Sequence, residues 1–162
     1  MQLTQARLPR VAIGAAVVGH GLALAGFIQP WIVGQFGVRD RLSGLDLARL
    51  AGELLTDGLA GEIFALQISR LVLLLVPLAA VNALALLAAT RIGVLSHHTA
   101  HRVAVLLAIP IALVAVASLL LVLVSTGDDS VLNRPDFGLV IVIAGAALAL
   151  GSAALTRNHL TS

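Results

Sequence analysis

His20 is the one ionisable residue in the middle of a long apolar run, which extends over residues 11–29. A titratable side chain at such a position marks a candidate functional site, because hydrocarbon does not solvate it. His20 lies between Gly19 and Gly21, which leave room for a flat ring against a helix. It is therefore a candidate axial ligand for haem or bacteriochlorophyll, although a two-histidine haem site would need a second histidine at the same depth.

Two other roles for His20 are compatible with the sequence. A neutral imidazole can hydrogen-bond to a neighbouring helix, and Asn82 is the expected partner because it lies at nearly the same depth in its own apolar run. The two residues would then form a polar intramembrane pair. Proton transfer is the third role. In each case we expect His20 to face another helix, because an unsatisfied imidazole in lipid is energetically costly.

A second group of histidines, His97, His98 and His101, forms the pattern H-H-x-x-H. On a helix, the first and last would share a face four residues apart, as zinc ligands can. A third ligand is missing from this segment, and His159 could join only through tertiary packing. We therefore interpret residues 90–102 as a solvated basic loop and expect no metal site there.

The adjacent acids Asp128 and Asp129 lie in a turn before Asp136. This turn lacks the alternating spacing of a Ca²⁺-binding loop, so we interpret it as a solvated turn. The sequence also has no serine–histidine–aspartate order, no glycine-rich phosphate loop and no metalloprotease helix. We expect no catalytic residues, and hence a protein that is not an enzyme.

The composition of the chain explains where these residues must lie. Hydrophobic residues make up 59% of the 162 residues and charged residues only 11%, whereas a soluble domain has about 25% charged residues. The mean hydropathy is +1.05. Such a chain needs lipid as its solvent. The absence of cysteine excludes disulfides and thiolate metal sites. A net charge of only +2, without a basic run interleaved with aromatic residues, argues against nucleic acid as a partner.

Four apolar segments are each about long enough to cross the ~30 Å hydrocarbon core of a bilayer. They predict an all-α integral membrane protein with a single membrane domain over residues 1–162. The first segment also has signal-peptide features, with a small-x-small sequence at Ala23 to Ala25, but we interpret it as a span. The predicted transmembrane helices cover residues 11–29, 71–89, 103–124 and 137–155.

The long connection between the first two spans carries the other structural signals. Trp31, the only tryptophan, follows Pro30 and is the expected anchor at the membrane interface. Residues 34–44 are rich in glycine and charge and predict a loop. Ser43 is a good N-cap for a helix over residues 44–57. That helix is amphipathic, with one apolar face, and we expect it to lie along the membrane or a partner. Its apolar face is formed by Leu47, Leu50, Ala51 and Leu54.

Small residues recur every four positions in the first and last predicted spans. Such stripes let two helices approach closely in lipid, where packing takes the place of the hydrophobic effect. The expected helix-packing residues are Ala15, Gly19, Ala23, Gly145, Ala149 and Ala153.

The distribution of charge predicts the orientation. With four spans, both termini share a side with the histidine segment, and that side has five arginines and no acid among the chain's eight. The other side also has five arginines, but Arg39, Arg41 and Arg49 lie among acids in a long loop, where they count less. We therefore expect a multi-pass inner or plasma membrane protein with both termini in the cytoplasm. Because all ten basic residues are arginine, and alanine and glycine are abundant, we expect a bacterial source.

Two resemblances concern topology. The run Gln29-Pro30-Trp31, followed by S-G-L-D-L-A at residues 43–48, resembles small bacterial four-helix membrane proteins of unassigned function. The order of segments is also similar to claudin-type proteins, which have inner termini, a long first outer loop and a short second one. Claudins carry W-x-x-C and a second cysteine in that loop, and this chain has neither. Strands between residues 34 and 57 would favour the claudin-type comparison.

The function that the sequence favours is a non-enzymatic membrane subunit or accessory protein. Its partners would be the lipid bilayer and the helices of other membrane subunits, and it would carry no cofactor. The alternative is a pigment- or haem-binding subunit of a photosynthetic or respiratory complex that uses His20. A small transporter or channel is the third function, which the absence of Asp, Glu and Arg within the predicted spans disfavours.

Overall fold

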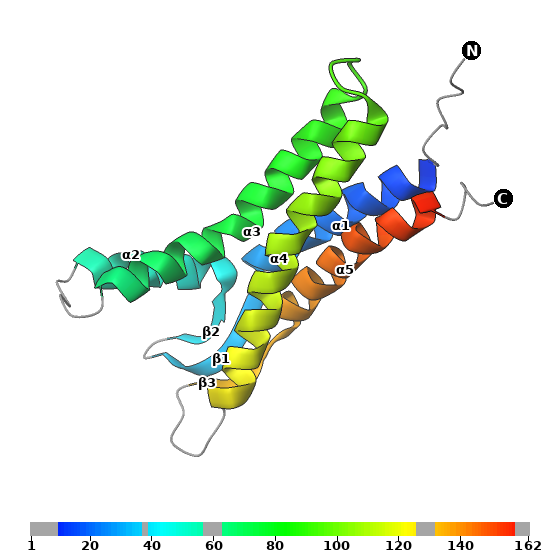
Figure 1. Cartoon of the computed structure of the whole chain (residues 1–162). Coiled ribbons are helices and arrows are strands. Elements are labelled where there is room, and N and C mark those ends of the chain that lie inside the picture. The colour runs from blue at the N-terminus through cyan, green and yellow to red at the C-terminus, as the bar shows by residue number, and fades with distance from the viewer. Residues whose placement is uncertain (1–9, 37–38, 57–62, 126–131, 158–162) are drawn as a thin grey trace, which may run out of the picture.

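Five helices and a small sheet make up the computed structural model, which describes residues 10–36, 39–56, 63–125 and 132–157 (Figure 1). The elements in chain order are α1 (Arg10–Ile28), β1 (Pro30–Phe36), β2 (Arg39–Ser43), α2 (Gly44–Thr56), α3 (Ile63–Ala89), α4 (His97–Ser125), β3 (Leu132–Pro135) and α5 (Phe137–Arg157).

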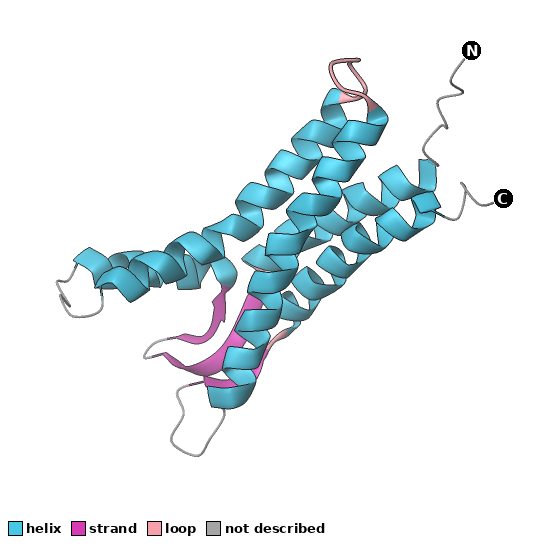
Figure 2. Cartoon of the chain, in the orientation of Figure 1, coloured by secondary structure: helices cyan, strands magenta, loops and turns pink. Residues whose placement is uncertain are grey.

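Four of the helices are long and apolar enough to cross a membrane. The first turn of α1, the last turn of α5 and the connection between α3 and α4 lie at one end of the bundle (Figure 1). The sheet lies at the opposite end (Figure 2). The four candidate spans are Arg10–Ile28, Gln67–Ala89, His97–Val124 and Phe137–Thr156.

The connection between α3 and α4 is shorter than the loop predicted over residues 90–102. Helix α4 already begins at His97, because Ser96 caps it: the Thr99 amide donates to Ser96 Oγ at 3.1 Å. A side-chain oxygen at this position satisfies an amide that has no partner within the helix. Gly93 has φ = 76°, a left-handed conformation that glycine adopts without strain and that turns the chain after α3. The histidines therefore lie on a helix and not in a loop.

The predicted loop at residues 34–44 is wrong, because most of it forms two strands. β1 pairs with β2 on one side and with β3, from the connection between α4 and α5, on the other, both antiparallel. Ile32 lies opposite Leu42 and is buried with it. The next residue, Val33, lies opposite both Arg41 and Arg134, and these arginines are exposed. One face of the sheet thus covers the core, and the other carries charge.

Helix α2 spans Gly44–Thr56, close to the range predicted for the amphipathic helix. A reciprocal cap starts it: the Asp46 amide donates to Ser43 Oγ at 3.1 Å, and the Ser43 amide donates to Asp46 Oδ2 at 3.1 Å. Ala48 and Ala51 are buried, whereas Leu50 is 39% exposed. Figure 1 shows why: α2 lies alongside the first turns of α3, so part of its apolar face packs within the chain itself.

Helices α1 and α5 make the most extensive contact between two elements, and they run antiparallel (Figure 1). Their buried positions alternate in steps of four and three residues, the heptad spacing that keeps one seam facing a partner helix. Four of the predicted helix-packing residues lie in the seam: Gly19, Ala23, Gly145 and Ala149. The prediction used a constant spacing of four residues, which turns gradually away from the seam. Ala15 and Ala153 are therefore only half-buried. The seam is defined as the buried positions at this spacing, which are Ala12, Ala16, Gly19, Ala23 and Gly26 in α1 and Gly138, Val142, Gly145, Ala149 and Ser152 in α5. The two backbones approach most closely where Gly19, Ala23 and Gly26 meet Gly138, Val142, Gly145 and Ala149.

Candidate functional sites at His20 and His101

His20 lies inside the bundle, with 0% of its surface exposed. Its Nδ1–H donates to the carbonyl oxygen of Ala16, four residues earlier in the same helix, at 2.8 Å. This bond satisfies one ring nitrogen without any help from a neighbouring helix, which is a common solution for polar groups in hydrocarbon. His20 therefore faces protein, as expected.

The second ring nitrogen of His20, Nε2, is buried and has no hydrogen-bond partner. The carbonyl group of Ala104, in α4, is near the imidazole but does not form a hydrogen bond with Nε2. With the proton on Nδ1, Nε2 presents a lone pair. It is thus a basic nitrogen that the packing leaves unused, at a level where α1, α3 and α4 meet. The small residues buried around this level are Ala16, Ala83, Ala100 and Ala104.

The predicted pair of His20 and Asn82 does not form. The Asn82 amide donates to the carbonyl oxygen of Leu78 in its own helix at 2.7 Å, and the Asn82 side chain lies exposed on α3. Equal depth placed the two residues at one level, but depth does not determine which way each side chain points around its helix axis. Each residue instead uses a carbonyl one turn earlier in its own helix.

The room for a flat ring beside His20 is largely filled. A Cβ on Gly19 would lie 2.6 Å from the amide nitrogen of Ala149 and from the carbonyl oxygen of Gly145, so α5 occupies that side. Of the two glycines that flank His20, Gly21 alone has no atom within 4 Å of its Cβ position. Nε2 has the chemistry of an axial ligand, but a haem or bacteriochlorophyll ring would require α1 to move away from its neighbours. The packed site does not fit such a group.

Of the H-H-x-x-H histidines, His97 and His98 are exposed at the start of α4, whereas His101 is only 3% exposed. The interpretation of this segment as a solvated loop is therefore wrong for His101. Its Nε2 lies 3.0 Å from the hydroxyl of Ser152 in α5. Ser152 itself donates to the carbonyl oxygen of Ala149 at 2.6 Å, so it accepts from His101. The bond from His101 joins α4 to α5, and the bond to Ala149 holds the Ser152 hydroxyl in place within α5.

The described residues hold no group of three or more histidine, cysteine, aspartate or glutamate side chains that could bind a metal ion. His159, Asp128 and Asp129 lie outside the described residues. Ser152 was not among the predicted site residues. One sequence signal points to it: Gly138, Gly145 and Ser152 are spaced by seven residues, the period of the α5 seam.

Trp31 was predicted to anchor the chain at a membrane interface, but its side chain lies inside the protein and has no surface free to contact lipid. The side chain is 0% exposed and lies in the main hydrophobic core. Its Nε1–H donates to the carbonyl oxygen of Gly26 at 2.8 Å, in the last turn of α1. Phe27 meets the indole edge to face, with ring centroids 5.6 Å apart. Trp31 thus joins β1 to the end of α1, and its polar group is satisfied inside the protein.

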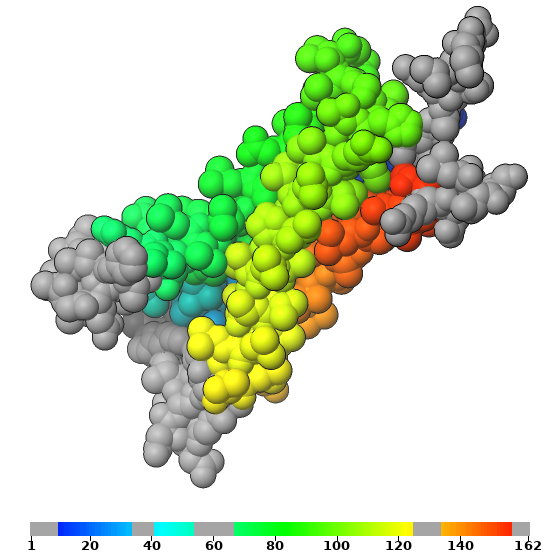
Figure 3. Space-filling view, viewed as in Figure 1, coloured from blue at the N-terminus to red at the C-terminus, as the bar shows by residue number. Residues whose placement is uncertain are grey.

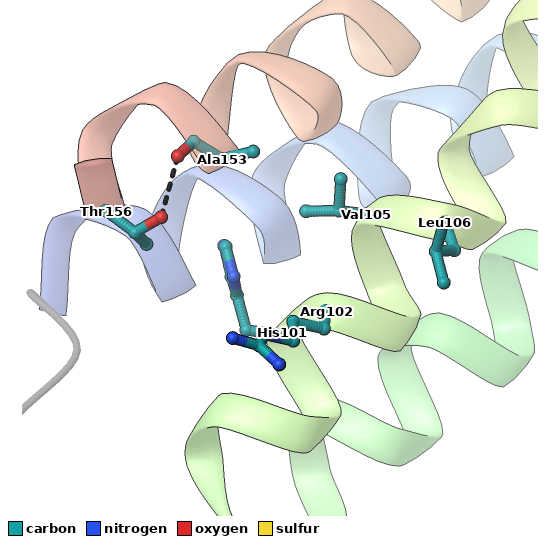
Figure 4. A pocket seen from close by; sticks show the side chains of 6 residues that line it. All are labelled: His101, Arg102, Val105, Leu106, Ala153 and Thr156. Carbon is teal, nitrogen blue, oxygen red and sulfur yellow. Dashed lines mark hydrogen bonds between the residues drawn. The ribbon is translucent and has the colours of Figure 1, made fainter. Parts of the chain in front are cut away.

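The described structure has a shallow groove between α4 and α5, at the end of the bundle where α4 begins (Figure 4). Its volume is about 310 Å³. His101 points from α4 toward α5, and the Thr156 hydroxyl donates back to the carbonyl oxygen of Ala153 at 2.7 Å (Figure 4). The lining residues are His101, Arg102, Val105, Leu106, Ala153 and Thr156.

Comparison with known proteins gives no match: no family model, curated protein or solved structure is similar to this chain.

Proposed function

We propose that this protein is a non-enzymatic integral membrane subunit or accessory protein whose helices pack against those of partner subunits. The observation that carries this proposal is the uneven burial of the spans. In an apolar window of 18 residues taken from each span, 28% of the residues are buried inside the chain for α3 and α4, against 39% for α1 and α5. Large apolar side chains of α3 and α4 therefore face outward, where lipid or another apolar helix must cover them. Examples on these two helices are Leu71, Leu78, Leu106, Leu113 and Leu121.

The shape of the bundle supports the same function. α4 runs along the face shown in Figure 3, with α3 on one side of it and α5 on the other. Inside the bundle, polar side chains use carbonyls of their own helices: His20 bonds to Ala16, and Ser152 bonds to Ala149. These bonds stay within one helix and leave only Nε2 of His20 without a partner among the two side chains. Close packing of α1 against α5 leaves α3 and α4 as the faces most available to partners.

A second candidate function is pigment or haem binding, which the unpartnered Nε2 of His20 favours. The packing at Gly19 opposes it, because α5 fills the space that a ring would need on that side. In a loaded state, Nε2 of His20 would hold the group, and the group would supply light absorption or electron transfer. Binding of this kind would have to separate α1 from a neighbouring helix.

Purification in a mild detergent tests both functions. We expect the wild-type protein to migrate with a partner subunit in a fixed ratio, to show no visible absorption band, and to keep both properties in the variant His20→Leu. A protein that purifies alone as a monomer would contradict the accessory role. A visible band that disappears in His20→Leu would instead establish the pigment or haem function.

We also propose an orientation with the sheet outside the cell and the opposite end of the bundle in the cytoplasm. The side that carries the termini and the histidine segment has arginines but no acidic residue in the sequence, which is the charge bias expected of a cytoplasmic side. The strands in the long first connection favour the claudin-type comparison as a likeness of topology alone.

Reporter fusions check this orientation. We expect a reporter inserted near Ser96, and another fused after Ser162, to be active only as cytoplasmic reporters, and one inserted near Gly44 to be active only outside. The positions are informative because Ser96 lies in the connection between α3 and α4, whereas Gly44 follows the sheet at the other end. A cytoplasmic signal from the Gly44 fusion would reverse the orientation of the whole bundle.

A further inference from the structure

The groove between α4 and α5 is lined by polar residues at one end and by apolar residues at the other. In α4, His101 and Arg102 come one turn before Val105 and Leu106, and one turn of helix is about 5.4 Å long. α5 runs the other way. Its Thr156 therefore lies nearer the end of the bundle than the apolar part of the groove. Both helices thus place polar groups at the rim and apolar groups below it.

This order matches the profile of a phospholipid at the boundary between headgroup and acyl chain. The rim carries positive charge: Arg102 is exposed and, within the part of the chain that the structure describes, has no ion-pair partner. A guanidinium group can donate several hydrogen bonds to one phosphate, and it keeps its charge at any physiological pH. Val105, Leu106 and Ala153 offer only apolar surface below it.

The other two polar residues at the rim, His101 and Thr156, already donate their hydrogen bonds to groups within the protein. His101 uses Nε2–H to bond to Ser152, and Thr156 uses its hydroxyl to bond to Ala153. Arg102 is therefore the side chain that would hold an anion. His101 has a different part in the groove. Its bond to Ser152 joins α4 to α5 beside the groove, so we expect His101 to act as a positioning residue.

We propose that this groove binds one anionic phospholipid from the leaflet at the end where α1 begins, with the phosphate at Arg102 and an acyl chain against Val105, Leu106 and Ala153. The inference rests on the proposed insertion of the four helices in a membrane. A membrane lipid suits the site because the groove is open and shallow, so that it covers one side of a chain while the bilayer covers the other. The charge at the rim selects an anionic headgroup over a zwitterionic one.

Native mass spectrometry of the full-length protein, released from detergent with added phosphatidylglycerol or phosphatidylcholine, tests this proposal. We expect one phosphatidylglycerol molecule to bind in preference to phosphatidylcholine. Arg102→Gln should weaken the binding of phosphatidylglycerol about tenfold, the scale of a charge-assisted hydrogen bond. Ala153→Leu should weaken it by filling the apolar part without any change in charge. Arg91→Gln is the matched control, because Arg91 is exposed between α3 and α4 but does not line the groove.

Equal losses in Arg91→Gln and Arg102→Gln would overturn the proposal, because the attraction would then be that of a basic surface and not of a site. Equal binding of the two lipids would overturn it as well. His101→Ala provides a further readout: it should reduce the preference for one bound lipid, whereas His97→Ala should not. Extraction of the membranes with carbonate is done first. A protein released by carbonate would contradict the proposed membrane insertion itself, and this failure differs from loss of the lipid preference in an inserted protein.

Discussion

Replacing Gly19 by alanine is expected to destabilise the bundle by about 2 kcal/mol, although alanine is the better helix former. The reason is the neighbour that the new methyl group would meet. The Cβ would lie 2.6 Å from two backbone atoms of α5, the amide nitrogen of Ala149 and the carbonyl oxygen of Gly145. Backbone atoms cannot rotate away as a flexible side chain can, so α1 and α5 must separate along the seam.

Gly21→Ala is the matched control for this experiment, because no atom lies within 4 Å of its Cβ position. Here the change should be neutral or should stabilise α1 by up to about 1 kcal/mol, the helix-propensity difference between the two residues. Unfolding in detergent can be followed by the fluorescence of Trp31, since the chain has one tryptophan and no tyrosine. Equal stability of the two variants would contradict the close packing of α1 on α5.

The four spans could be predicted from the sequence because a single property, hydrophobicity over a long window, determines them. Helix ends depend on weaker local signals. Ser43 was visible as a cap, and α2 begins right after it. Ser96 is a cap of the same kind. Because polar histidines follow it, the segment resembles a loop in the sequence, and the start of α4 at His97 was not predicted. Composition is therefore sufficient to predict where the helices lie, whereas their starting residues depend on side-chain caps.

The sheet could not be predicted in the same way. β1 and β2 include Gly34 and several charged residues, and their pairing depends on β3, which comes about a hundred residues later in the chain. Long-range pairing of this kind leaves no local pattern. The buried face is short and is carried by Ile32 opposite Leu42. In the sequence, these residues look like isolated apolar positions in a charged loop.

The partners of polar side chains were the least predictable feature. Depth in the membrane can be counted from the sequence, but the direction around a helix depends on packing that the sequence does not show directly. His20 and Asn82 were matched by depth, yet each bonds within its own helix. His101 and Ser152 do bond between helices, but they lie 51 residues apart, and each belongs to a segment that was interpreted by itself.

Replacing Trp31 by alanine should have the largest effect on stability, a loss of about 3–5 kcal/mol, the usual range for removing a large buried aromatic side chain. Trp31 is fully buried, and its neighbourhood is crowded: a Cβ on Gly44 would lie 2.7 Å from Phe27 and 2.9 Å from the indole of Trp31. The carbonyl oxygen of Gly26 would lose the indole donor and keep only the Gln29 amide, at 3.2 Å. The end of α1, β1 and the start of α2 all meet at this one side chain.

Limited digestion with trypsin, together with thermal unfolding followed by circular dichroism, measures this effect. Arg41 lies in β2 and pairs with Val33 of β1. Its Nε lies 3.7 Å from Oδ2 of Asp136, the residue before α5. Trypsin can therefore cleave after Arg41 only when the sheet opens locally. Trp31→Ala should speed cleavage after Arg41 severalfold. Trp31→Phe keeps an aromatic ring but loses the bond to Gly26, so it should lower the free energy of unfolding by only about 1 kcal/mol. The competing interpretation, a tryptophan that anchors the chain at the membrane surface, predicts little loss of stability in either variant. Unchanged cleavage at Arg41 in Trp31→Ala would therefore show that this side chain does not hold the sheet on the bundle.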